Sequence, residues 1–497
     1  MIISPIKLAY LFLISILLMV IACGGSERIE SPSSAGIATS KPAPTAIPKP
    51  APTATSKPAP TVTPKPDPTQ ESTLDTDLIK RRSKIPFPFS IPRTDFTPPS
   101  IEGRFSELLE SAFTKALKTE FEAHNEKMGI SAAIYKAGKG WSGTVGYANS
   151  TTLMTTDIPL RLMSTSKTYL GALVLTQITE GLYSLDDKVS TLLSAHDGYK
   201  SLDKTIIPDV TIRKLLTMRS GVLGTHGDSG KMNSFRVMSD QNWDPVDTLD
   251  LATTPAEASG TYKYSPIMNS YLLALIAEEK GNNDILTLYQ TKLLNSININ
   301  VGLLPLTDPP TNLAKAYADR SNYGGSDGFG DLGEIEVYTS YGLDYHKVDG
   351  RLSWAGAGIV STPSSVARWG YELMSPNGIA VSSDVRTELT ESFVDEWVSM
   401  TETRQKYGFH LMLTEHELAD GTLVLSYGHP GGGSGFGSGL FYVPSLDISI
   451  SIIANSEIQQ LLGACTDPNK GASTQRELLS PISCIVTDFL QTLMPNN

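Results

Sequence analysis

Apolar residues recur along most of the chain at spacings that predict a series of helices and strands. Residues 105–121 carry apolar side chains at helical spacing, and residues 130–135 and 141–147 indicate two strands joined by a Gly-Lys-Gly turn. Strand patterns return much later in the chain, and a helix follows them near residues 477–493. These later strands are expected at residues 407–413, 422–427, 439–443 and 448–454.

The segment between the two groups of strands, residues 164–374, is predicted to consist mostly of helices and long loops. Helical pieces are expected at residues 165–181, 210–217 and 270–280. Residues 319–350 are rich in Gly, Tyr and Asp without a clear period, which indicates an irregular loop. Because strands lie at both ends, residues 85–497 are predicted to form one α+β domain. It is a mainly antiparallel β-sheet flanked by helices, with an inserted helical region.

The N-terminus has the order of a secretory signal. Lys7 precedes an apolar run over residues 8–20, and Ala22 precedes Cys23. This arrangement resembles a bacterial lipoprotein signal, which implies that residues 1–22 are removed and that a lipid is attached to Cys23. An ordinary cleaved signal and an uncleaved anchor helix are the alternatives, although the apolar run is short for a membrane span. All three interpretations predict export.

Residues 23–84 differ in composition from the rest of the chain. They are dominated by Pro, Ala, Thr, Ser and Lys, and the sequence Lys-Pro-Ala-Pro-Thr recurs from Lys41, Lys49 and Lys57. Such a segment has too little apolar area to offset the entropy lost on ordering, and its prolines favour extended backbone. We therefore expect a disordered tether between the membrane anchor and the folded domain.

Charge and cysteine content limit the classes of partner and cofactor. The chain has 497 residues and a formal net charge of −12, and an acidic surface argues against nucleic acid as a partner.

Two cysteines besides Cys23 remain, Cys465 and Cys484, and an exported chain can join them in a disulfide. No Cys/His cluster has metal-ligand spacing, and no nucleotide or redox cofactor motif stands out. We therefore expect neither a metal nor a cofactor.

A Ser-x-x-Lys motif at Ser164 and Lys167 is the candidate centre of chemistry. Residues three apart share one side of a helix, so the lysine amine would lie near the serine hydroxyl. A serine needs a nearby base to act as a nucleophile, and a desolvated, neutral lysine can be that base. The motif is short, however, and it occurs again at Ser4–Lys7 and Ser201–Lys204. A helix-capping serine beside a surface lysine is the plain alternative.

The order of several further segments resembles the serine β-lactamase-like superfamily, and within it the class C β-lactamase and D-alanyl-D-alanine carboxypeptidase family. The resemblance extends over about residues 107–493. It implies that Ser164 is the nucleophile and Lys167 its base. The segments that carry the resemblance are residues 162–193, 212–221, 259–265 and 354–362.

The family's second motif is Tyr-x-Asn, whose tyrosine helps to move protons between the nucleophile and the leaving group. Tyr264 fits this tyrosine, but Pro266 occupies the asparagine position. That asparagine usually binds the base lysine and the substrate amide. Asn269 is a candidate replacement if the loop carries an insertion.

The family's third motif is Lys-Thr-Gly, or His-x-Gly in some peptidases and esterases, on a strand at the edge of the site. His429-Pro430-Gly431 fits this motif, and strands follow it. The resemblance implies that His429, Gly431 and Gly432 bind substrate. It also implies that the backbone N–H groups of Ser164 and Gly432 form an oxyanion hole.

The sequence thus predicts an exported, membrane-tethered serine hydrolase acting through an acyl-enzyme. The implied substrates are D-alanyl peptides of cell walls, β-lactams, or small esters and amides. Pro266 and His429 favour a peptidase or an esterase over an efficient β-lactamase. The alternative from another class is a cell-wall-binding module or scaffold that keeps the fold with little turnover. Neither interpretation fixes the oligomeric state.

Overall fold

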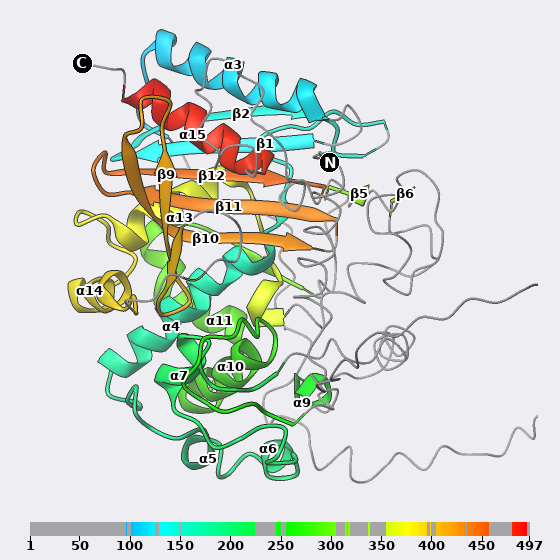
Figure 1. Cartoon of the computed structure of the whole chain (residues 1–497), viewed down its shortest axis with the longest axis vertical. Helices are drawn as coiled ribbons and strands as arrows, with labels where there is room; N and C mark the ends of the chain where they lie inside the picture. The colour runs from blue at the N-terminus through cyan, green and yellow to red at the C-terminus, as the bar shows by residue number, and fades with distance from the viewer. Residues whose placement is uncertain are drawn as a thin grey trace, which may run out of the picture. The chain divides into compact units, whose positions relative to one another are not determined.

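The computed structural model describes most of the C-terminal part of the chain (Figure 1). The chain divides into two units, 1–79 and 80–497, and every described residue belongs to the second. The predicted signal, Cys23 and tether therefore lie outside the described residues. None of the helices that the structure describes is long and apolar enough to cross a membrane. The described residues are 96, 101–124, 129–149, 151–223, 245–249, 255–304, 314–315, 317–318, 336–337, 354–394, 398, 404–433, 435–456 and 480–494.

A seven-stranded antiparallel sheet is the centre of the described domain. Its strand order is β2-β1-β12-β11-β10-β9-β8, and β1 pairs with β12 through the register Ile130↔Ala454 to Tyr135↔Ser449. The two ends of the domain sequence therefore meet in one sheet, which confirms the predicted α+β class. The strands are β1 (Gly129–Lys136), β2 (Lys139–Gly146), β8 (Gln405–Tyr407), β9 (Met412–Glu417), β10 (Leu423–Gly433), β11 (Phe436–Val443) and β12 (Ile448–Ala454).

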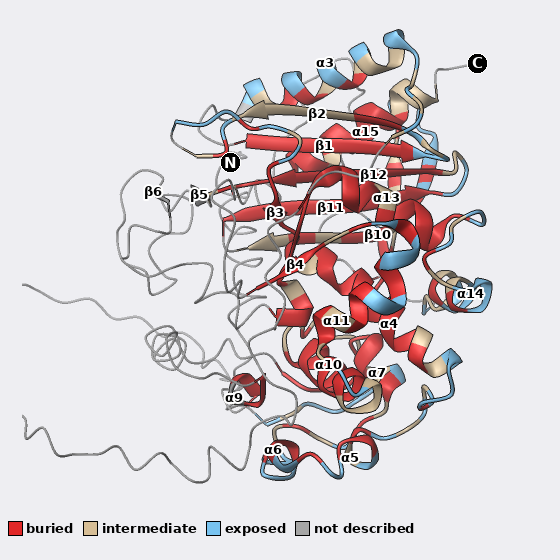
Figure 2. Ribbon diagram, turned by 180° about the vertical axis from the view of Figure 1, so that it is seen from behind, coloured by how far each residue is buried: buried red, intermediate tan, exposed pale blue. Residues whose placement is uncertain are grey.

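Helices cover both faces of this sheet, so its central strands are buried on both sides (Figure 2). Along β1, Ile130, Ala132 and Ile134 pack with α3 (Glu107–His124) and α15 (Pro481–Leu493). Because successive side chains of a strand point to opposite faces, Ala133 and Tyr135 join the other core. That core also contains α13 (Pro363–Met374), which begins at the side-chain cap Thr362.

The segment inserted between β2 and β8 is mainly helical, as predicted. Two small sheets accompany it, β3-β7-β4 and β5-β6. The small strands are β3 (Leu160–Arg161), β4 (Gly302–Leu303), β5 (Tyr317–Ala318), β6 (Glu336–Val337) and β7 (Ile359–Ser361). The remaining helices are η1 (Met163–Ser166), α4 (Lys167–Thr179), α5 (Val189–Leu192), α6 (Asp197–Lys200), α7 (Ile212–Leu216), α9 (Pro245–Leu249), α10 (Met268–Gly281), α11 (Ile285–Tyr289), η3 (Gln290–Leu294), η4 (Asn295–Ile297) and α14 (Ser383–Glu391).

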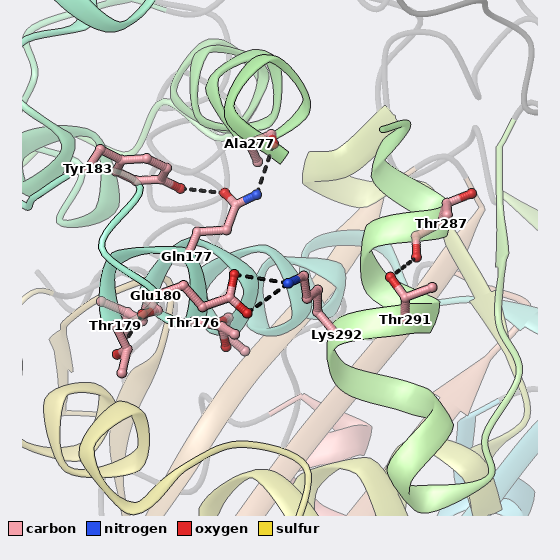
Figure 3. A network of polar contacts seen from close by, with 11 residues as sticks. Thr176, Gln177, Thr179, Glu180, Tyr183, Ala277, Thr287, Thr291 and Lys292 are labelled. Carbon is pink, nitrogen blue, oxygen red and sulfur yellow. Dashed lines mark hydrogen bonds and ion pairs between the residues drawn. The ribbon is translucent and has the colours of Figure 1, made fainter. Parts of the chain in front are cut away.

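Helix α4 is the central helix of this region, and its residues from Lys167 to Leu175 are all buried. Figure 3 shows how its C-terminal end is held. The Gln177 amide donates to the Ala277 carbonyl of α10 at 2.9 Å and accepts from the Tyr183 hydroxyl at 2.6 Å. The Lys292 amine also donates to the Glu180 carboxylate at 2.7 Å. These contacts fix α4 against its neighbours, so its N-terminal end has a defined position near β10.

The structure differs from the predicted elements in three places. Residues 407–413 do not form one strand, because the chain turns between β8 and β9 and His410 adopts a positive φ of 56° there. Strand β10 extends beyond the predicted 422–427 to Gly433, and so includes the His-Pro-Gly motif. The first turn of the helix predicted at 165–181 is the 3-10 turn η1. The loop predicted at 319–350 lies outside the described residues, apart from β6.

Candidate active site

Ser164 lies on the short turn η1, between strand β3 and helix α4. The preceding residue, Met163, has a φ of 46°, which is a rare backbone conformation for a side chain of this size. The turn is tied to β7, since the Leu162 N–H donates to the Ile359 carbonyl at 2.8 Å and the Ile359 N–H donates to the Ser166 hydroxyl at 3.1 Å. Ser164 remains partly exposed although its neighbours are buried. Ser164 is therefore the most accessible residue of this turn.

Lys167, the first residue of α4, lies directly behind this hydroxyl. Its amine donates to Ser164 Oγ at 3.1 Å and to the Gly356 carbonyl oxygen at 2.7 Å. The side chain is fully buried, and desolvation lowers the pKa of Lys167 to about 7. A substantial fraction of Lys167 is therefore neutral at physiological pH. A neutral amine at this distance can take the serine proton.

Tyr264 lies beside this pair. Burial raises the pKa of Tyr264 well above its usual value, and its interaction with Ser164 acts in the opposite direction. The Lys167 amine also lies 5.5 Å from the centre of the Tyr264 ring. Since the phenol stays protonated near neutral pH, Lys167 is the stronger candidate for the base. Tyr264 can then donate a hydrogen bond or relay a proton.

His429 lies on β10, and both of its ring nitrogens have protein partners. Nδ1 is 2.5 Å from the Pro430 carbonyl oxygen, and Nε2 is 3.3 Å from the Tyr407 hydroxyl. A carbonyl oxygen can only accept, so Nδ1 carries the hydrogen and Nε2 accepts from the tyrosine. Burial, followed by the nearby Lys167, lowers the pKa of His429 to about 3. The imidazole is therefore neutral, and its ring centre lies 6.2 Å from that of Tyr264.

The glycines after His429 allow β10 to approach the serine turn closely. A Cβ atom placed on Gly431 would collide with the Leu162 carbonyl oxygen and would lie 2.8 Å from the Ser164 nitrogen. The contact is reinforced by Thr165, whose hydroxyl donates to the His429 carbonyl at 2.8 Å. The neighbouring Ser438 hydroxyl donates to the Leu162 carbonyl at 2.5 Å. Only a residue without a side chain fits at position 431 in this arrangement.

The alternation of β10 indicates where the Gly432 N–H points. Pro430 has no N–H and pairs with Gly439 of β11, so it must occupy a position whose nitrogen faces away from β11. Gly432 is two residues further along, and its N–H therefore points the same way. The pairing of β10 with β9 ends at Gly428, so β9 does not cover this stretch of the strand. The Gly432 N–H is thus available at the strand edge for hydrogen bonding.

The predicted site residues come together in one place. Lys167 lies beside both Ser164 and Tyr264, and β10 brings His429 and Gly431 close to them. Asn269 does not replace the missing asparagine, because its side chain accepts from the Ser220 hydroxyl and donates to the Met218 sulfur. The carbonyl oxygen of Pro266 lies close to Gly356. A Cβ atom placed on Gly356 would be 2.9 Å from this oxygen.

The second Ser-x-x-Lys motif of the domain has no such geometry. The Ser201 hydroxyl donates to the Gly198 carbonyl, and the Lys204 amine donates to the Tyr199 carbonyl, each at 2.8 Å. Both side chains therefore bond to backbone oxygens of the short helix α6 that precedes them. Spacing alone does not distinguish this motif from Ser164 and Lys167, whereas burial and partners do.

Two residues that contribute hydrogen bonds to the site, Gly356 and Tyr407, could not be identified from the sequence. Gly356 lies in one of the segments that carry the family resemblance, but the sequence does not reveal that its carbonyl accepts from Lys167. Tyr407 gives no sequence signal, because its hydrogen bond to His429 depends on the position of β8, which is separated from β10 by β9 in the sheet. Cys484 is buried in α15 and is disulfide-bonded. Cys465 lies outside the described residues, so the pairing of these two cysteines stays a prediction.

The fold and the arrangement around Ser164 define a domain of the serine β-lactamase/transpeptidase type. The Beta-lactamase family model matches residues 116–462, which is more than half of the chain. The chain therefore belongs to the Beta-lactamase family. No group of three or more His, Cys, Asp and Glu side chains in the described ranges could hold a metal ion.

Solved structures of low sequence identity share this fold. D-amino acid amidase from Ochrobactrum anthropi SV3, complexed with L-phenylalanine amide, has a TM-score of 0.58 and 16% identity, covering 78% of this chain and 98% of its own. D-stereospecific amidohydrolase from Streptomyces sp. has a TM-score of 0.53 and 19% identity, covering 70% and 94%. The penicillin binding protein from Bacillus halodurans has a TM-score of 0.50 and 17% identity, covering 66% and 92%. No curated protein sequence matches the chain.

Proposed function

We propose that this protein is a serine hydrolase that works through an acyl-enzyme on Ser164. The observation that carries the proposal is the 3.1 Å contact between the Ser164 hydroxyl and the buried Lys167 amine. A serine hydroxyl beside a base whose pKa is about 7 meets the requirement for nucleophilic attack at neutral pH. Membership of the Beta-lactamase family supports the same class of reaction.

The proposed reaction has two stages. In the first, Ser164 Oγ attacks the carbonyl carbon of the acyl donor while its proton moves to the Lys167 amine. The backbone N–H groups of Ser164 and Gly432 stabilise the negative charge on the carbonyl oxygen. Tyr264, whose ring centre lies 5.5 Å from the Lys167 amine, relays a proton to the leaving group as the bond to it breaks. In the second stage water attacks the acyl-serine and releases the acid, and the serine regains its proton.

The acyl donors that we propose are D-alanyl peptides of the cell wall, β-lactams, or small esters and amides. The names of the structural neighbours, a D-amino acid amidase, a D-stereospecific amidohydrolase and a penicillin binding protein, agree with this range. Support for a peptidase or an esterase over an efficient β-lactamase comes from Pro266 at the usual asparagine position. In agreement, the Lys167 amine donates to the Gly356 carbonyl, and the Asn269 side chain has other partners.

We further propose that the protein is exported and anchored to a bacterial membrane by lipid on Cys23, with residues 23–84 as the tether. Support comes from the order of Lys7, the apolar run and Ala22-Cys23 in the sequence. Metabolic labelling with a radioactive fatty acid should mark the parent protein and not a Cys23→Ala variant. Equal labelling of the two proteins would contradict the anchor.

Active-site labelling tests the proposed reaction. A fluorophosphonate probe should label the parent protein and should not label Ser164→Ala, because the serine oxygen is the nucleophile. Ser201→Ala is the matched control and should be labelled like the parent. Undiminished labelling of Ser164→Ala would refute the assignment. Binding of cell-wall fragments by the parent without any acylation would instead favour a binding module.

A further inference from the structure

We infer that this site selects acyl donors that carry no negative charge on the leaving group, and that the His429–Tyr407 pair sets this selectivity. The inference rests on the proposed function, since it concerns the same Ser164 site. It narrows the substrate class to neutral esters and amides. Donors with a carboxylate beside the scissile bond, including peptides with a free C-terminus there, are then poor substrates.

The position of His429 places it next to the side chain that is proposed to serve the leaving group. Tyr264 is the residue proposed to pass a proton to the leaving group, and the His429 ring lies 6.2 Å from the Tyr264 ring. The Tyr407 ring lies 6.0 Å from Tyr264 and 5.8 Å from His429. These three rings therefore form one cluster beside Lys167 and Ser164, which we call the His429 wall.

His429 has no positive charge and no spare N–H to offer a carboxylate. Its Nδ1 hydrogen goes to the Pro430 carbonyl, and Nε2 accepts from Tyr407. The side chain is 1% exposed, and this burial is the main reason that the pKa of His429 is lowered to about 3. Tyr407 is itself fully buried, and burial raises its pKa well above the usual value, so it remains a donor to Nε2. Tyr407 is thus a positioning residue that fixes the neutral tautomer.

Two cationic side chains near this wall, Arg219 and Lys167, are already engaged. Arg219 is 8% exposed, donates to the Thr217 carbonyl at 2.9 Å and lies 5.4 Å from the Tyr262 ring centre. The Lys167 amine is held between Ser164 and Gly356 and must be neutral to act as a base. A carboxylate at the His429 wall would therefore lose its hydration without gaining a counter-charge from these groups, which is costly in a buried site. A neutral ester or amide avoids this penalty.

A matched pair of substrates separates charge from shape. The 3-carbamoylphenyl and 3-carboxyphenyl esters of N-acetyl-D-alanine share the acyl group and differ in the leaving group by an amide in place of a carboxylate. Their kcat/KM values on the full-length parent protein, each divided by the rate of hydroxide hydrolysis, give the selectivity. We expect the neutral ester to be preferred at least about tenfold. Equal values, or a preference for the carboxylate ester, would overturn the inference.

Variants at the wall test the assignment to His429. His429→Lys should reduce the preference at least about tenfold, because it places an ammonium group where the neutral imidazole stands. His429→Gln adds no charge and should keep the parent preference, which also controls for loss of packing. If His429→Lys does not fold, the selectivity of the parent protein and that of Tyr407→Phe still test the inference. Tyr407→Phe frees Nε2, favours protonation of His429 and should weaken the preference with a larger effect at low pH.

The outcomes distinguish this inference from the proposed function. Acylation of Ser164 by both esters at equal normalised rates would leave the serine hydrolase intact and refute the selectivity. Unchanged selectivity in folded His429→Lys and Tyr407→Phe would refute the role of the pair. The proposed function would be refuted if neither ester acylated Ser164 and the fluorophosphonate probe did not label it. The inferred selectivity would then be refuted as well.

Discussion

The Lys167 amine donates a 2.7 Å hydrogen bond to the Gly356 carbonyl oxygen. Because a carbonyl oxygen only accepts, this contact uses one N–H of the lysine and orients the amine. The Ser164 hydroxyl lies 3.1 Å from the same nitrogen. In the neutral amine the lone pair is thus available to the serine proton. The Gly356 carbonyl therefore positions a base that the sequence alone identifies only by its spacing from the serine.

The first prediction concerns the pH dependence of catalysis. Lys167 must be neutral to accept the serine proton, and burial lowers its pKa to about 7. Activity should therefore rise with pH through an apparent pKa near 7 and level off above it. The measurement is kcat/KM for a neutral ester between pH 5 and 9, read as a profile for the free enzyme. A flat profile across this range, after correction for hydroxide hydrolysis, would contradict a lysine base.

The second prediction uses the two Ser-x-x-Lys motifs as a matched pair. Lys167→Met removes the base and should lower kcat for ester hydrolysis by about 10²- to 10⁴-fold, the range for general base catalysis. Lys204→Met removes the lysine of the other motif, whose amine donates to the Tyr199 carbonyl, and should leave kcat within about twofold. Steady-state kinetics on both variants checks this. Comparable losses in the two variants would show that Lys167 has no special role.

The third prediction concerns the close approach of β10 to the serine turn. A Cβ at position 431 would collide with the Leu162 carbonyl and lie 2.8 Å from the Ser164 nitrogen. Gly431→Ala should therefore push the strand away from the turn and disturb the proposed oxyanion hole. We expect kcat to fall about 10²-fold and the free energy of unfolding to fall by about 1–3 kcal/mol. Urea denaturation and ester kinetics measure the two effects, and parent-like kcat would argue against this geometry.

The fourth prediction concerns stability in acid. His416 is 5% exposed, its Nε2 lies 2.8 Å from the Ser426 hydroxyl, and burial lowers its pKa to about 4. The unfolded chain has the ordinary histidine pKa near 6.5, so between about pH 6.5 and 4 it binds more protons than the folded protein. The free energy of unfolding should therefore fall as the pH is lowered through this window. His416 contributes on the order of 3 kcal/mol to the fall.

Urea denaturation of the parent and of His416→Gln, at pH 7.5 and at pH 4.5, measures that contribution. The variant keeps a group that can bond to Ser426 but cannot titrate, so its loss of stability in acid should be smaller than that of the parent. His429, whose pKa is about 3, continues to titrate in the variant, and part of the loss should remain. Parallel losses in the two proteins would rule out His416 as a source of acid sensitivity.

Much of the fold could be predicted from the sequence because the strands and helices have clear apolar periods. The predicted strand at residues 448–454 matches β12, and the helix at 270–280 lies within α10. The turn between β8 and β9 was missed because apolar residues continue through it, and His410 takes up a φ that the sequence does not signal. The spacing of apolar residues indicates which positions are buried and in which type of element. It does not indicate where a buried strand turns back.

The candidate site was predictable at the residues that carry motifs, and unpredictable where backbone atoms or distant pairs contribute. Recognisable short motifs contain the four candidate side chains Ser164, Lys167, Tyr264 and His429. The Gly356 carbonyl is a backbone group that any residue would supply, so no side chain marks it. The tautomer of His429 depends on its hydrogen bond with Tyr407, which comes from another strand. Such pairings arise from tertiary packing and require the structure.

Acyl-enzyme trapping tests the central claim most directly. The purified full-length protein is quenched with acid during turnover of an activated ester, and separately after incubation with a penicillin, and its intact mass and peptide map are measured. The account predicts a mass increase equal to the acyl group of the ester, located on the peptide that contains Ser164 and missing from Ser164→Ala. An adduct on another residue, or ester turnover that persists undiminished in Ser164→Ala, would contradict it.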